Sequence, residues 1–214
     1  MKQLFTLFLG LALTVGFAQK KELKAAQKQF KASKVDEAKA TLEANKALFE
    51  GTSDTKIKTQ YHFLLGKIAR LDKAFKVAYD NLKLAEGNSA IKTDLGEEMQ
   101  QLTSDIVNAA IEQSEAKDFI ASSNNLFLAY QMDPEANEDY LYYAATNAVN
   151  GSDYPLALER YIILRDINYT GVVTKYYVTE VATGQESEVS ATEYGIYQKS
   201  KSYTNAREEE SESK

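Results

Sequence analysis

The chain of 214 residues contains no cysteine, no tryptophan and a single histidine, His62. Without cysteine it can form no disulfide bond, it has no thiol nucleophile, and it cannot build a cysteine-ligated zinc site. One histidine likewise excludes a zinc site with several histidine ligands. Because N-terminal lipidation needs a cysteine at the cleavage site, a lipoprotein is also excluded.

Sequence motifs that carry chemistry are missing as well. The chain has no G-x-S-x-G elbow, no G-x-x-x-x-G-K-[ST] loop, no H-E-x-x-H and no calcium loop. His62 lies beside Phe63 and Leu64, which predicts a structural histidine packed against apolar neighbours. The acidic pair Glu97-Glu98 is expected on a solvated helix face, because nothing nearby in the sequence desolvates it. We therefore expect no catalytic residue, no metal, no cofactor and no enzymatic activity.

The N-terminus has the pattern of a secretory signal peptide over residues 1–18. Lys2 supplies the positive charge, and residues 4–17 form an apolar run of 14 residues. Gly16 and Ala18 fit the small-residue cleavage rule. The alternative is a membrane anchor, but the run is shorter than the roughly 20 residues that a spanning helix needs. The mature protein is expected in the periplasm or secreted, without a membrane span, and the leader resembles those of bacterial envelope proteins of the Bacteroidota.

Charge is distributed unevenly along the expected mature chain. Residues 19–58 carry 10 basic and 6 acidic side chains, residues 59–149 carry 7 and 14, and residues 150–214 carry 7 and 11. A protein that binds duplex nucleic acid needs a basic face, and only the first segment is basic, so no nucleic-acid partner is expected. The lysines of residues 20–34 are expected on a solvated helix face, and contact with anionic lipid or an acidic partner is the alternative.

One helical spacing occurs four times in the chain. Each copy is centred on a small residue. Two residues lie 13 and 12 positions before it, an apolar residue lies three positions before it, and two further residues lie four and seven positions after it. The copies are Ala25, Ala26, Val35, Ala38, Leu42 and Asn45; Leu65, Gly66, Phe75, Ala78, Leu82 and Ala85; Ala109, Ala110, Phe119, Ser122, Leu126 and Ala129; and Ala144, Ala145, Tyr154, Ala157, Tyr161 and Leu164. Small residues are expected where two helices touch, and large ones where a helix meets the next unit.

These residues resemble the tetratricopeptide repeat (TPR), which has small residues early in its first helix and an alanine in its second. The resemblance implies an all-α, superhelical stack of about four helix-turn-helix hairpins over residues 19–168. The chain departs from the family by its lack of tryptophan and by closing only the third unit with Asp133-Pro134. Its repeat distances are 40, 44 and 35 residues, against a family period of about 34. The first two intervals are therefore expected to contain inserted turns.

Amphipathicity supports the helical pattern independently of the family. Segment 35–49 places Val35, Leu42 and Phe49 on one stripe, with lysine and glutamate residues opposite. A single hairpin of this kind cannot bury its apolar face alone, so stacking against neighbouring hairpins must supply the core.

The C-terminal third has a different pattern, and 12 of the 14 tyrosines lie between Tyr130 and Tyr203. Residues 174–181 are β-branched and aromatic and are followed by a turn and a weaker strand, which predicts a small β-hairpin. Tyrosines at helical spacing then predict a terminal helix that shields the last apolar face. The expected segments are the β-hairpin insertion at 169–190, the terminal helix at 191–206 and a charged, frayed tail at 207–214.

In the TPR family the first helix of each hairpin lines a concave groove. Carried over to this chain, the resemblance implies a groove lined by Gln60, Phe63, Lys67, Arg70, Ser104, Val107, Ile111, Ser114, Asp139, Tyr142, Thr146 and Val149. Such a groove suits an extended peptide whose acidic or carboxylate end lies near Lys67 and Arg70. Apolar side chains of that peptide would contact Val107, Ile111 and Tyr142. For each of these residues, ordinary packing or solvation is the alternative role.

The leading hypothesis is a non-catalytic scaffold or adaptor of the bacterial periplasm that binds a protein or peptide partner in this groove. A second hypothesis is a glycan-binding or cell-surface assembly component that uses the tyrosine-rich region 169–203. A third is the input half of a longer regulatory repeat protein that is truncated at Lys214. The sequence leaves the oligomeric state and the identity of the partner open.

Overall fold

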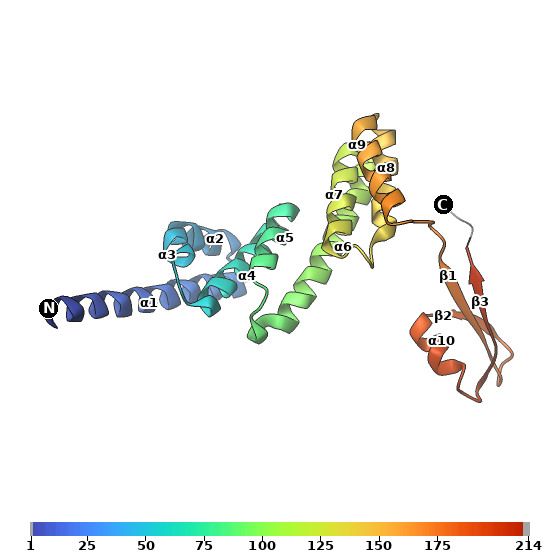
Figure 1. Cartoon of the computed structure of the whole chain (residues 1–214). Helices are drawn as coiled ribbons and strands as arrows, with labels where there is room; N and C mark the ends of the chain where they lie inside the picture. Colours follow the sequence, from blue (N-terminus) through green and yellow to red (C-terminus); the bar gives the residue numbers. More distant parts are fainter. Residues whose placement is uncertain (1, 212–214) are drawn as a thin grey trace. The chain divides into compact units, whose positions relative to one another are not determined.

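The computed structural model describes residues 2–211, with side chains described from residue 17 onward. The chain divides into two compact units, with the boundary between Arg160 and Tyr161 inside α9 (Tyr154–Asp166), and each unit is described by itself (Figure 1). The signal peptide expected at residues 1–18 falls almost entirely outside the described side chains. In the part of the chain whose side chains are described, no helix is long and apolar enough to cross a membrane.

The first unit consists of consecutive helical hairpins joined by short turns. Its elements are α1 (Lys2–Lys31), α2 (Val35–Ala44), α3 (Lys46–Glu50), α4 (Thr55–Leu71), α5 (Phe75–Leu84), the 3-10 helix η1 (Ser89–Ile91), α6 (Lys92–Glu115), α7 (Phe119–Met132), α8 (Glu138–Asn150) and α9 (Tyr154–Asp166), which continues into the second unit. Helix α1 packs on α2, α4 on α5, and α6 on α7, and α4 also contacts both α1 and α6. The extra elements α3 and η1 lie in the first two repeat intervals, where inserted turns are expected.

The same turn joins the two helices of every hairpin. The residue two positions before each second helix has a left-handed backbone, with φ of 59° at Ser33, 57° at Lys73, 63° at Lys117 and 61° at Ser152. This residue donates its N–H to the carbonyl three positions earlier, and the next residue donates to the carbonyl five positions earlier, at 2.8–3.0 Å. These two bonds form a Schellman motif, which satisfies the last carbonyls of the first helix. The four units predicted from the helical spacing are therefore equivalent at their turns.

Glycine is expected to stabilise these turns, because a left-handed backbone strains any residue that has a Cβ. We expect Ser152→Gly to raise the free energy of unfolding by about 0.5 kcal/mol. Ser104→Gly is the matched control, since Ser104 is exposed in the interior of α6 and the same change there should cost about 0.5 kcal/mol. Urea denaturation of both variants measures the difference. A loss of stability in Ser152→Gly would show that the turn is not strained.

Eight small residues of the repeat pattern, two in each copy, are buried. They are Ala26 and Ala38, Gly66 and Ala78, Ala110 and Ser122, and Ala145 and Ala157. At Gly66 the hairpin is so tightly packed that a Cβ would lie 2.6 Å from Leu82 Cδ2. Ser122, the polar member of the set, donates from Oγ to the Ala110 carbonyl at 2.7 Å, so its hydroxyl is satisfied.

The apolar faces of successive hairpins pack against one another. One core cluster joins α1, α2 and α3 to α4, and in it the Phe49 ring stacks on Tyr61 with ring centres 4.8 Å apart. A second joins α4 and α5 to α6 and α7, and Leu82, Leu102 and Ile106 are fully buried there. A smaller cluster joins α6 and α7 to α8. Each hairpin thus covers part of the next, as a hairpin without a core of its own requires.

The second unit contains a three-stranded antiparallel sheet and a short helix. Its elements are β1 (Thr174–Glu180), β2 (Glu186–Val189), α10 (Ala191–Tyr197) and β3 (Tyr203–Glu210), and the strand order is β2-β1-β3. The predicted β-hairpin is confirmed, because β1 pairs with β2 from Tyr176↔Val189 to Thr179↔Glu186. The fold is therefore mostly helical, with a small antiparallel sheet near the C-terminus in which β3 adds a third strand to the expected hairpin.

The terminal helix is much shorter than the expected range of 191–206. A capping box of Ser190 and Glu193 starts α10, and the helix ends at Tyr197. Tyr203, expected on the same helix, instead begins β3 and stacks on Tyr197 with ring centres 4.0 Å apart. Helical spacing of tyrosines therefore does not predict a continuous helix here, because Tyr197 and Tyr203 contact each other across the turn between α10 and β3.

The expected frayed tail at 207–214 is also wrong for the residues that the structure describes. Its first four residues belong to β3, which pairs with β1 from Thr174↔Glu210 to Glu180↔Tyr203. Arg207 of β3 forms an ion pair with Glu186 of β2. Its guanidinium carbon also lies 4.2 Å from the centre of the Tyr177 ring, which suits a cation–π interaction. Nearly every residue of β3 is exposed, because the strand has no buried face. Its sequence therefore lacks the alternation of apolar and polar residues that normally predicts a strand.

Candidate functional site

Two hollows lie beside the first helices of the hairpins, α1, α4, α6 and α8. The first hollow has a volume of about 330 Å³ and is lined mainly by α1 and α4. The second hollow has a volume of about 350 Å³ and is lined by α6, α7 and α8. Both contain residues of the groove that the TPR resemblance implied.

The first hollow combines aromatic and cationic side chains. Gln60, Phe63 and Lys67 line it, together with Phe30 of α1, which the repeat pattern did not identify. The Lys67 ammonium lies 5.3 Å from the centre of the Phe63 ring and 5.5 Å from that of Phe30. Both distances suit a cation–π interaction. The two rings therefore hold Lys67 in place.

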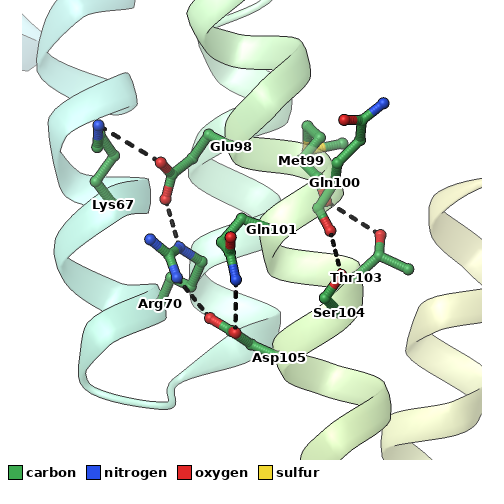
Figure 2. A network of polar contacts seen from close by, with 9 residues as sticks. All are labelled: Lys67, Arg70, Glu98, Met99, Gln100, Gln101, Thr103, Ser104 and Asp105. Carbon is green, nitrogen blue, oxygen red and sulfur yellow. Dashed lines mark hydrogen bonds and ion pairs between the residues drawn. The ribbon is translucent and has the colours of Figure 1, made fainter.

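Arg70 has a different role from the one expected. Figure 2 shows its guanidinium between two carboxylates of α6: Nε donates to Glu98 at 2.5 Å, and Nη1 donates to Asp105 at 2.5 Å. Gln101 donates to the other oxygen of Asp105 at 3.1 Å. Arg70 therefore links α4 to α6, and it does not supply the cation that the acidic end of a peptide would need.

Glu98 also departs from the expectation drawn from the sequence. Its side chain is only 7 % exposed, whereas the sequence predicts a solvated position for the pair Glu97-Glu98. The buried carboxylate is stabilised by Arg70 and by Lys67, whose Nζ lies 3.5 Å from its second oxygen. Both cations belong to the preceding hairpin, so the neighbours of Glu98 in the sequence gave no sign of them.

The second hollow has an apolar wall. Val107, Ile111 and Ser114 line it, as the resemblance implied, and Leu126 and Tyr143 line it as well. Ile111 is 52 % exposed and Tyr143 is 44 % exposed, although both have large apolar side chains. A binding surface is one reason for a protein to expose such side chains together.

Other residues of the implied groove lie outside both hollows. The ring of Tyr142 makes an edge contact with Tyr143 at 5.6 Å between ring centres, and Thr146 donates to the Tyr142 carbonyl at 3.0 Å. The remaining members of the set are Ser104, Asp139 and Val149, and none of them lines either hollow. On α8 the hollow is therefore reached by Tyr143 and not by its neighbour in the sequence.

A third hollow, of about 460 Å³, is lined by polar side chains of α5, α6 and α7. Several of these groups already have partners within the protein. Asn125 donates to Gln113 Oε1 at 2.8 Å, and Asn124 Oδ1 accepts from Arg160 at 2.7 Å. This hollow contains no residue of the implied groove, so we do not assign the site to it.

Arg160 of α9 is a buried residue that the sequence did not identify. It is 2 % exposed, and it also donates to the Ala144 carbonyl at 3.3 Å and lies 5.0 Å from the centre of the Phe127 ring. Burial lowers the pKa of Arg160 by removing its charge from water. Its contacts join α9 to α7 and α8, which is a structural role.

The described residues contain no group of three or more histidine, aspartate or glutamate side chains that could hold a metal ion. His62 is buried, and its Nδ1 lies 2.9 Å from Asn81 Oδ1, which is the structural role expected for it. Comparison of the chain with models of protein families, with curated proteins and with solved structures gave no match.

Proposed function

We propose that this protein is a TPR-like scaffold or adaptor that binds an extended segment of a protein partner across α1, α4, α6 and α8. The observation that carries the proposal is the position of the two hollows, which lie beside the helices that line the groove in the TPR family. The shared turn geometry at Ser33, Lys73, Lys117 and Ser152 supports a true structural repeat. The proposed role is non-catalytic. The predicted signal peptide would place the protein in the bacterial periplasm.

Recognition in this proposal uses surfaces that already exist before the partner arrives. An extended peptide loses conformational freedom on binding, and walls held by a packed core add little ordering cost of their own. Successive side chains of an extended segment point in opposite directions, so alternate ones can enter a hollow. The second hollow, at about 350 Å³, has room for a large apolar side chain.

The glycan-binding hypothesis has less support in the tyrosine-rich second unit. The rings of Tyr176 and Tyr194 lie 4.8 Å apart between centres, and Tyr194 is buried. Tyr197 and Tyr203 stack on each other at 4.0 Å. Rings that cover one another are poor platforms for a sugar, so we favour the peptide groove.

A displayed library of random peptides tests the proposal. The wild-type protein is expected to select a related set of peptides, and Ile111→Glu should lose this set, because the substitution places a charge in an apolar hollow. Val77→Glu on α5 is the matched control, since Val77 is 53 % exposed and lines neither hollow, and it should select as the wild type does. An unchanged selection by Ile111→Glu, or no selection by the wild type, would refute the peptide groove.

A further inference from the structure

The part of the chain that builds the second hollow is strongly acidic. Residues 92–150 contain two lysines, no arginine and eleven acidic side chains, which is a net charge of −9. Glu98 and Asp105 are neutralised by cations of α4. The described residues provide no ion-pair partner for Glu115, which lines the second hollow and is exposed. Negative charge therefore remains available at this surface.

Two helix ends add to the negative potential at one end of the second hollow. Ser114 and Glu115 belong to the last turn of α6, Asn147 belongs to the last turn of α8, and all three line the hollow. A helix carries about half a negative charge at its C-terminus, and a basic side chain in the last turn normally balances it. Neither helix has a basic residue there. Lys117 follows in the turn after α6 but does not line the hollow.

The rest of the second hollow has a complementary, apolar character. Val107, Ile111, Leu126 and Tyr143 form its wall, and Ile111 and Tyr143 are the two whose exposed surface a partner would cover. Across the polar end, Ser114 Oγ donates to Asn147 Oδ1 at 3.1 Å, so these two groups satisfy each other. The hollow thus offers an apolar wall next to an unbalanced negative end.

We infer that the second hollow binds a peptide segment in which a bulky apolar residue is flanked by lysine or arginine. The inference rests on the proposed function and adds the chemistry of the partner. The apolar side chain covers Ile111 and Tyr143, and removal of their surface from water favours binding. The flanking cation pairs with Glu115 and with the ends of α6 and α8. An acidic segment would be repelled by the same groups.

Three matched synthetic peptides of about twelve residues, labelled for fluorescence anisotropy, test the inference. The first has a central phenylalanine flanked by lysines, the second replaces the lysines with glutamates, and the third replaces the phenylalanine with serine. We expect the lysine–phenylalanine peptide to bind about tenfold more tightly than either of the others, and to weaken as salt is raised. Glu115→Lys should weaken its binding about tenfold, and Asp36→Lys, an exposed reversal on α2, should not.

Each contrary outcome has a distinct meaning. Equal or tighter binding of the glutamate–phenylalanine peptide would overturn the inference and leave the peptide groove intact. Equal binding of the serine peptide would show that charge alone acts, which also overturns it. A dimer in sedimentation experiments that Ile111→Glu dissociates would identify a second copy of the chain as the occupant. If no peptide binds and the displayed library selects none, both the inference and the proposed function fail.

Discussion

Replacing Arg70 with methionine is expected to lower the free energy of unfolding by about 3 kcal/mol. The substitution keeps most of the side-chain volume but removes the guanidinium that bonds to Glu98 and Asp105 (Figure 2). Glu98, at 7 % exposure, is then buried with only Lys67 near it, at 3.5 Å. A buried carboxylate that loses its main partner is strongly destabilising. Urea denaturation of the wild type and the variant measures the change.

Two further variants separate the ion pair from the loss of packing. Lys67→Met should cost less than about 1 kcal/mol, because Lys67 is more exposed and its contact is longer. Arg70→Met combined with Glu98→Leu should recover most of the stability, since no unpaired buried charge remains. If Arg70→Met alone costs as little as Lys67→Met, Arg70 is not the link between α4 and α6 that we describe.

Adding a methyl group at Gly66 is expected to have the second largest effect. The new Cβ of Gly66→Ala would lie 2.6 Å from Leu82 Cδ2 and 3.2 Å from the Ala78 carbonyl oxygen. Leu82 is fully buried and cannot move aside without disturbing the core. We expect Gly66→Ala to lower the free energy of unfolding by about 2 kcal/mol, measured by urea denaturation.

Gly96 provides the matched control for this prediction. It lies in the interior of α6, and a Cβ added there meets nothing within 4 Å. Gly96→Ala should therefore raise the free energy of unfolding by about 0.8 kcal/mol, through the higher helix propensity of alanine. The two substitutions are chemically identical but should have opposite signs. A stabilising Gly66→Ala would mean that the helices do not cross as closely as the repeat pattern requires.

The repeat pattern could be predicted from the sequence because it depends on local spacing. Small residues such as Gly66, Ala78 and Ser122 recur at fixed separations along two helices joined by a short turn, so the sequence alone brings them together. The turn itself was harder to predict. Its left-handed residue is Ser33 or Lys73, for example, and neither is the glycine that usually marks such a position.

Interactions between hairpins could not be predicted, because they depend on how one unit packs on the next. Arg70 and Glu98 are 28 residues apart and belong to different hairpins, and an inserted segment lies between them. The TPR has a shorter period than this chain, so the resemblance does not predict which residues of successive hairpins face each other. The burial of the Glu98 carboxylate could not be predicted either, because the cations that pair with it belong to the preceding hairpin and not to its neighbours in the sequence.

The candidate site was predicted in part, and its misses have physical causes. Val107 and Ile111, which the TPR resemblance implied, lie in the second hollow, since the small residues Ala109 and Ala110 fix the register of the repeat on α6. On α8 the sequence has adjacent tyrosines at 142 and 143, and a shift of one residue rotates a helix by about 100°. The resemblance selected Tyr142, whereas Tyr143 lines the hollow.

Site-specific photo-cross-linking tests most directly whether peptides bind across the first helices. A photoreactive phenylalanine is introduced at Tyr143, which lines the second hollow, and in a separate variant at Val77, which is exposed on α5. With the lysine–phenylalanine peptide, we expect an efficient cross-link from position 143 and none from position 77. Equal yields from both positions, or a cross-link from position 77 alone, would contradict a binding groove on α1, α4, α6 and α8.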